Sequence, residues 1–337
     1  MSLLAYSVRR LLLLVPTLLG VTALTFVLIR VLPGDPVATI LGPTATPDEI
    51  EAARQRFGLD EPLLVQYWHY LGDLVRGDFG TSIQTGRSVA DEMLDRLGPT
   101  LELVILAVVI ALVFALTLGI WSAMRVNRPS DHAIRVSSLL GNAFPDFWVG
   151  LLLILVFYAT LGWAPAPSGR VDGDAGLRVI TGSGIIDSLV TGNMVALRSV
   201  LAHLALPVIT LVIAITAPLL RSVRVSALEV RGSDAYAVAV AHGMPTRRLV
   251  RDYLFRPTVA RLPALVALVL GFTLGSVVLV EQVYSWQGLG QWALRGVLYR
   301  DYPVVQAAVL VMAVIYMLAF AVADIVQAVL DPRIRLS

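Results

Sequence analysis

Several carboxylates, Asp146 and Glu281 among them, lie in or beside long apolar stretches of this chain, where an ionisable side chain is costly and commonly functional. Asp146 lies about ten residues into one stretch and directly follows Pro145, a residue that can kink a helix. Glu281 follows another stretch and opens a segment with Tyr284 and Trp286. Asp146 is predicted either to line a polar path through a membrane or to be satisfied by a neighbouring helix, and both interpretations stay open.

The residues needed for several kinds of catalysis are missing. Cysteine is absent, which excludes disulfides, thiol nucleophiles and thiolate metal sites. Lysine is also absent, so any ATP that drives this protein binds another chain, because a phosphate-binding loop needs its lysine. The sequence contains no His-Glu-x-x-His zinc motif and no Gly-x-Ser-x-Gly nucleophile turn. We therefore predict a chain that is not an enzyme and that holds no metal and no cofactor.

Long apolar segments must position the few polar residues. The chain has 337 residues, of which 57% are hydrophobic and only 15% charged, against about 25% charged in soluble domains. The apolar residues form blocks of about 20, the length that crosses a bilayer as a helix. The sequence predicts an all-α, polytopic membrane protein whose six transmembrane helices lie near residues 11–31, 101–124, 136–161, 201–220, 262–280 and 304–330.

Arginine is distributed unevenly among the loops, and cytoplasmic loops are enriched in basic residues. Segment 221–261 has eight arginines against three acidic residues. The long segment 32–98 instead has an excess of acidic residues. This pattern places both termini and segment 221–261 in the cytoplasm.

Segment 32–98 also contains signals for two short helices. Thr46 and Glu49 form a capping box for a helix that can end at Gly58. Pro62 begins a second helix, whose apolar residues recur at helical spacing up to Leu74. The two helices form either a cap on the outer membrane surface or a docking surface for a protein that delivers substrate.

A short helix is predicted inside the arginine-rich segment 221–261. Ser233 or Asp234 can cap its start, alanines recur along it, and Gly243 with Pro245 can end it after His242. Such a slim helix can fit into a groove on another protein. The alternative is an ordinary cytoplasmic loop whose arginines reflect membrane orientation alone.

Small residues recur at two further places. Gly271 and Gly275 are spaced for close helix packing in the fifth predicted span. Segment 281–290 contains Gly288 and Gly290 together with its two aromatic residues. Those aromatic residues are either interfacial anchors or part of a gate that hinges at the glycines.

Eight short strings run through the chain in a fixed order. They are LPGDPV at 32–37, GLDEPL at 58–63, GDFGTS at 77–82, PDFWVGL at 145–151, HLALPVITL at 203–211, EQVYSWQGLG at 281–290, DYPVVQ at 301–306 and LDPRIR at 330–335. Together they make the whole chain resemble the dipeptide/oligopeptide/nickel permeases of bacterial ATP-binding-cassette importers. In the arginine-rich segment, Asp234, Ala239, Ala241 and Gly243 match the family's coupling-loop pattern, whereas Tyr236 arrives one place late and His242 stands where lysine is usual.

The resemblance implies a permease subunit in the bacterial cytoplasmic membrane, with a five-helix core after one N-terminal helix. It implies as partners a second, similar permease, two cytosolic ATPase subunits or one fused ATPase that bind ATP and Mg, and an extracytoplasmic, lipid-anchored substrate-binding protein. Membrane lipid surrounds the chain, and no nucleic acid is involved. We divide the chain into residues 1–99, with the first span and the outer loop, and residues 100–337, with the permease core and its coupling loop.

The predicted function is ATP-driven import of di- or oligopeptides through a path of which this chain forms half. Import of nickel or glutathione by the same machinery is the alternative, and an ion-driven secondary transporter is a more distant one. Contact with the ATPase is predicted for Glu229, Asp234, Ala239, Ala241, Gly243 and Arg247. The path or its gate is predicted to involve Asp146, Glu281, Tyr284, Trp286, Gly288 and Gly290.

Overall fold

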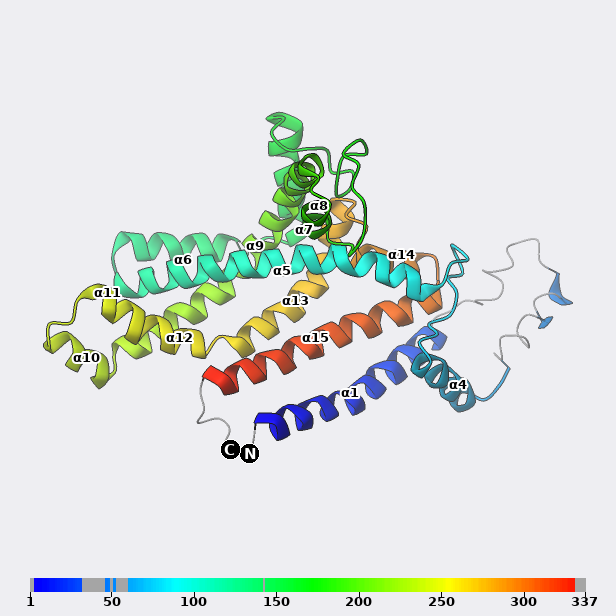
Figure 1. Cartoon of the computed structure of the whole chain (residues 1–337), viewed down its shortest axis with the longest axis horizontal. Coiled ribbons are helices and arrows are strands. Elements are labelled where there is room, and N and C mark those ends of the chain that lie inside the picture. Colours follow the sequence, from blue (N-terminus) through cyan, green and yellow to red (C-terminus); the bar gives the residue numbers. More distant parts are fainter. Residues whose placement is uncertain (1–2, 32–45, 49–50, 53–59, 142, 331–337) are drawn as a thin grey trace.

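Helices dominate the architecture. The computed structural model describes residues 3–31, 46–48, 51–52, 60–141 and 143–330. Among these residues, five helices are long and apolar enough to cross a membrane. They are α1 (Leu3–Val31), α5 (Val89–Met124), α9 (Met194–Arg231), α13 (Pro263–Val283) and α15 (Tyr302–Leu330). They form an elongated bundle with α10 (Asp234–Ala241) at one end and α14 (Leu289–Leu298) toward the other (Figure 1). We call these the α10 end and the α14 end.

The centre of the bundle is the pair α5 and α9, which lie side by side. Ala107, Ala111 and Ala115 of α5 are fully buried, and such small side chains let neighbouring helices approach closely. A Cβ added to Gly119 would lie 2.6 Å from the Cγ1 of Val223 on α9. Helix α13 packs against α9 and α15, and α1 packs against α15 (Figure 1). The five predicted spans that correspond to these helices are confirmed.

The third predicted span, residues 136–161, is interrupted. It comprises α6 (Pro129–Gly141), α7 (Asp146–Leu153) and a wide π-helical segment, Ile154–Thr160. Pro145 is the N-cap of α7, with φ −61° and ψ 140°. Proline has no N–H to continue a helical ladder and disfavours helical geometry in the residue before it, which accounts for the break. The sequence predicts only a possible kink at Pro145, whereas the structure has a break. The apolar helical part after the break is too short to count with the five long helices, so the sixth span stays a prediction.

Helix α4 (Leu63–Val75) covers the end of α1 that lies nearest α14 (Figure 1). The hydroxyls of Thr22 and Tyr67 lie 3.0 Å apart, and Nε of Arg30 donates to Oε1 of Gln66 at 2.9 Å. The helix predicted to start after Pro62 is therefore confirmed. The helix predicted between residues 46 and 58 falls mostly outside the described residues.

The predicted close-packing glycines differ in their surroundings. A Cβ on Gly271 would overlap the Tyr316 ring of α15, so this glycine permits the α13–α15 contact. Gly275 has nothing within 4 Å of such a Cβ. The predicted domain division at residues 99 and 100 falls inside α5, which continues through Pro99; the division itself stays a prediction.

Candidate functional site

Helix α9 is longer than a membrane's hydrocarbon layer is thick. The helix has 38 residues, which corresponds to about 57 Å at 1.5 Å per residue. A hydrocarbon core is only about 30 Å thick. Arginine occurs at 221, 224 and 231 near the C-terminus of α9. We call residues 221–231 the α9 arm, and α10 follows it directly.

The predicted short helix is confirmed as α10, with the predicted start and stop. Ser233 is its N-cap, and the Ser233 hydroxyl accepts a hydrogen bond from the backbone N–H of Tyr236. Asp234 lies in the first turn, where a negative charge favours the helix dipole. Gly243 follows the helix with φ +71°, a conformation that L side chains rarely adopt. Local sequence therefore determines both ends of α10.

Helix α10 exposes most of its surface. Its one buried side chain is Ala239, at 4% exposure. Val238 and Val240 are 55% and 48% exposed, and Ala241 is exposed as well. An apolar, slim helix with so little packing of its own is suited to contact another protein.

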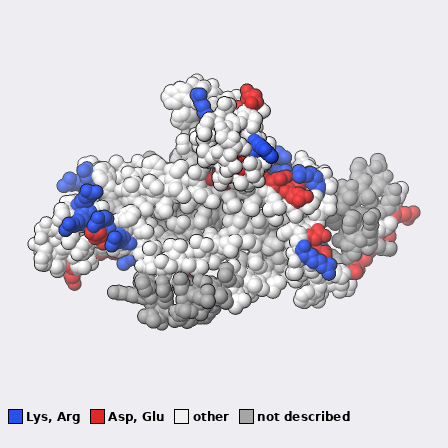
Figure 2. Space-filling model, in the orientation of Figure 1, with Lys and Arg blue, Asp and Glu red and all other residues white. Residues whose placement is uncertain are grey.

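The chain returns from α10 through α11 (Thr246–Arg248), a π-helical segment at Leu249–Phe255 and α12 (Arg256–Ala260). Buried Leu249 and Leu254 anchor this return. Arg247, predicted as a coupling residue, lies on α11 and is exposed. Glu229 lies on the α9 arm, where it forms an ion pair with Arg261. Basic side chains gather at this end of the surface (Figure 2).

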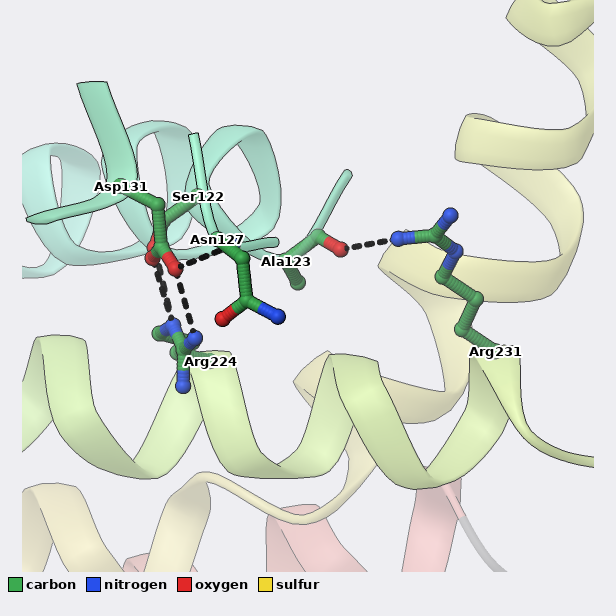
Figure 3. Close-up of polar contacts among 6 residues, drawn as sticks. All are labelled: Ser122, Ala123, Asn127, Asp131, Arg224 and Arg231. Atoms are coloured by element: carbon green, nitrogen blue, oxygen red, sulfur yellow. Dashed lines mark hydrogen bonds and ion pairs between the residues drawn. The ribbon is translucent and has the colours of Figure 1, made fainter. Parts of the chain in front are cut away.

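Beside the arm lies a buried polar cluster that the sequence analysis missed (Figure 3). Arg224 donates from Nε and Nη2 to the two carboxylate oxygens of Asp131 on α6, both at 2.9 Å. The hydroxyl of Ser122 on α5 also donates to Asp131 and accepts from Arg224 at 3.0 Å. The backbone N–H of Asn127 completes the set at 3.2 Å. We call Ser122, Asp131 and Arg224 the Asp131 joint.

Asp131 is fully buried, so its charge depends on these partners. The hydrogen bond from Arg224, helped by those from Ser122 and Asn127, holds the pKa of Asp131 well below its usual range, although burial alone would raise it. A second link ties the arm to α5, because Nη1 of Arg231 donates to the carbonyl oxygen of Ala123 at 2.8 Å (Figure 3). The sequence hint was that Asp131 is the single acid between Arg125 and Arg135.

A second polar cluster joins the end of α13 to α14 and α5. Glu281 is fully buried; its Oε1 accepts from the Thr100 hydroxyl at 2.5 Å and its Oε2 from the Gln291 backbone N–H at 2.9 Å. The same Thr100 hydroxyl accepts from the Leu289 backbone N–H at 2.7 Å. We call residues 281–291 the Glu281 turn. The Glu281 carboxylate fixes the backbone between α13 and α14.

The aromatic residues of the Glu281 turn point into the protein. Trp286 is fully buried, and its indole N–H donates to the Pro99 carbonyl at 3.1 Å. Tyr284 is 3% exposed, and its hydroxyl lies 3.0 Å from the Thr210 hydroxyl. The interpretation of these side chains as interfacial anchors was wrong.

The two glycines of the turn allow close packing. A Cβ on Gly288 would overlap the Glu281 carboxylate, and one on Gly290 would lie 2.7 Å from the Cα of Val278. Close packing therefore explains why both positions are glycine. Their predicted role in a gate stays a prediction.

Asp146 lies apart from both clusters, in the first turn of α7 directly after the helix break. It is half-buried, and among the described residues it makes no hydrogen bond or ion pair. Beside it, the rings of Phe144 and Trp148 stack with centroids 4.7 Å apart. The link to the Glu281 turn is indirect, because the Tyr284 hydroxyl donates to the carbonyl of Gly150 on α7 at 3.2 Å.

Comparisons with known proteins cover nearly the whole chain. Residues 115–336 match the family model of the binding-protein-dependent transport system inner membrane component, and residues 3–104 match the model of its N-terminal part. The dipeptide transport system permease protein DppB of Alkalihalophilus pseudofirmus is 36% identical over 98% of this chain and 99% of its own length. The di/tripeptide transport system permease protein DppB of Pseudomonas aeruginosa is 38% identical, with the same coverage. The glutathione transport system permease protein GsiC of Escherichia coli is 36% identical over 98% of both chains.

These matches agree with the bundle of apolar helices and with the order of short strings along the sequence. The chain belongs to the family of inner membrane components of binding-protein-dependent transport systems.

Proposed function

We propose that this chain forms half of the membrane path of an ATP-driven peptide importer and that α10 receives the movement of a separate ATPase. The observation that carries the proposal is the exposed apolar surface of α10, held at the end of a helix that reaches beyond the membrane. Hydrolysis of ATP, with its Mg, occurs in partner chains. A second permease and an extracytoplasmic, lipid-anchored binding protein complete the assembly.

The arginine-rich α10 end is the cytoplasmic end in this proposal, by the positive-inside rule. The five long helices and the interrupted segment α6–α7 then make six crossings. An even number of crossings places both termini in the cytoplasm. In Figure 1 the start of α1 and the end of α15 both point toward the side on which α10 lies. A cysteine-accessibility map would test this orientation, because the chain has no cysteine of its own.

The proposed cargo is a short peptide. The relatives are named for dipeptides, di- and tripeptides, and glutathione, which is itself a peptide derivative. Glutathione import is therefore the second candidate. Uptake assays with a dipeptide, a tripeptide and glutathione, each with its own binding protein, would separate the two.

The break between α6 and α7 marks the proposed path. Irregular backbone at membrane depth is tolerated only where protein buries it or where it lines a water-filled cavity. Phe144 and Trp148 are 47% and 40% exposed at this break, so the rest of this chain does not bury it. The break then faces the path or the second permease, and Asp146 lies on that face. The Glu281 turn supports α7 from behind through Tyr284.

The decisive experiment is reconstitution of the importer in lipid vesicles with its ATPase, second permease and binding protein. Val238→Arg places a charge on the exposed face of α10 and should abolish the stimulation of ATP hydrolysis by loaded binding protein. Val126→Arg is the matched control, because Val126 is a 37% exposed valine in the turn after α5. Normal stimulation in Val238→Arg, or peptide uptake by this chain without an ATPase, would refute the proposal.

A further inference from the structure

We propose that the Asp131 joint couples the α9 arm to α6, so that displacement of α10 reaches the break before α7. This inference rests on the proposed function and names the residues that carry movement within it. Arg224, Asp131 and Ser122 are positioning residues here, since none of them needs to touch cargo or the ATPase.

The first support is how α6 is attached to the bundle. Among its side chains of described exposure, Asp131 is the one that is buried; the others are exposed or half-buried. Of the apolar side chains of α6, Ile134 packs partly buried against the core, so apolar packing alone fixes the place of α6 only weakly. Its specific polar attachment to α9 and α5 is at Asp131, which accepts two hydrogen bonds from Arg224 and one from Ser122.

The second support is the geometry of that attachment. A guanidinium that meets a carboxylate through two parallel N–H···O bonds fixes orientation as well as distance. Ser122 binds both partners, so the end of α5 is part of the same joint. An apolar contact would let α6 slide along the arm, whereas this arrangement makes the start of α6 follow Arg224.

The third support is where the remaining freedom lies. Helix α7 is attached at other points, because the Tyr284 hydroxyl bonds to Gly150 and lies 3.0 Å from the hydroxyl of Thr210. Thr210 lies before Pro218 on α9, whereas Arg224 lies after it. A proline inside a helix removes a backbone hydrogen bond and can kink the helix, so the arm can move relative to Thr210. The irregular backbone before Pro145 lies between these two attachments. Movement of α6 relative to α7 is therefore absorbed at the break, beside Asp146 and the stacked Phe144 and Trp148.

The position of the joint completes the argument. Arg231, where the arm ends before α10, lies seven positions after Arg224. Arg231 bonds to the end of α5 through the Ala123 carbonyl, so arm, α5 and α6 meet within two turns of α9 (Figure 3). A displacement of α10 thus reaches α6 through directly bonded groups at the neighbouring ends of α9 and α5.

Two conservative variants test the joint in the reconstituted importer. Asp131→Asn keeps a hydrogen-bonding side chain but removes the charge, and Arg224→Lys keeps the charge but loses the planar fork. We expect both complexes to assemble and to hydrolyse ATP, while peptide uptake per ATP falls by about tenfold, within the range that coupling residues change. The matched control is Asp95→Asn, because Asp95 forms an exposed ion pair with Arg87.

Distances between paired labels distinguish coupling from a merely structural role. Because the chain has no cysteine, Ala133→Cys on α6 can be labelled with Val225→Cys on the arm or with Leu151→Cys on α7. In the wild-type background, ATP should change the α6–α7 distance and leave the α6–arm distance constant. In Asp131→Asn the α6–α7 change should disappear and the α6–arm distance should vary.

A full α6–α7 change in both joint variants, with unchanged uptake per ATP, would overturn the inference. If Asp131→Asn prevented assembly, the same labels in Arg224→Lys would decide. Failure of the joint is distinguishable from failure of the proposed function, because Val238→Arg tests α10 with the joint intact. An importer that depends on Val238 but tolerates both joint variants keeps the function and loses this inference.

Discussion

The α10 end and the Glu281 turn use polar residues in opposite ways. At the α10 end, arginines and an apolar helix face the surroundings, and Ala239 is the one buried side chain of α10. In the Glu281 turn, a carboxylate and two aromatic rings are buried, and glycines leave no room for a Cβ. In the proposed function, the first region is completed by another protein. The second is complete within this chain and holds α5, α7, α13 and α14 together.

The largest difference between the two regions should appear on removal of a buried ring. Trp286→Ala leaves a cavity and removes the indole hydrogen bond to the Pro99 carbonyl, and should lower the free energy of unfolding by about 3–5 kcal/mol. The control is Trp163→Ala, because Trp163 is 74% exposed. Thermal unfolding of the purified chain in mild detergent would measure both. Equal effects of the two substitutions would mean that the turn is not a rigid support.

The Asp131 joint is intermediate between the α10 end and the Glu281 turn, since it is buried but joins elements that are proposed to move. Asp131→Asn leaves Arg224 without its charge partner, and should lower the free energy of unfolding by about 3 kcal/mol near pH 7.

The pKa of Asp131 is depressed in the folded chain, so its contribution to stability is present above its unfolded pKa of about 3.9 and is lost as the pH falls toward the folded value. The difference between wild type and variant should stay constant from about pH 8 to 5 and shrink below about pH 4. Denaturant titrations across this range would measure it, and a difference that grew in acid would contradict the assigned ion pair.

Local signals made the α10 end predictable. Ser233 and Gly243 act on their own neighbours in the chain, so a cap and a stop could be assigned without knowledge of the fold. The five long helices were predictable for the same reason, because their apolar length is a local property. The break before α7 was predicted only as a possible kink at Pro145, since a proline can also be accommodated inside a long helix, as Pro207 and Pro218 are in α9.

Long-range pairs could not be predicted. Asp131 and Arg224 are 93 residues apart, and Thr100 and Glu281 are 181 apart. Nothing in the sequence around either partner specifies the other. The lone acid among arginines was a hint for Asp131, but the aromatic residues of the Glu281 turn were misleading. Their composition suits an interfacial anchor, and only the packing of α5 against the turn shows that Trp286 is buried.

The smallest effect on stability, and the sharpest contrast with the Glu281 turn, is expected at Gly243. Its φ of +71° is unfavourable for other residues, so Gly243→Ala should strain the end of α10 by about 1 kcal/mol. Gly232 is the control, because its φ is −81° and the nearest atoms to an added Cβ lie 3.6 Å away. Because α10 has little packing of its own, Gly243→Ala should leave thermal unfolding of the whole chain unchanged while it reduces peptide uptake in reconstituted vesicles. Gly232→Ala should change neither. Reduced global stability in Gly243→Ala would show that α10 is part of the bundle's core, and equal uptake in the two variants would show that its exact ending does not matter for coupling.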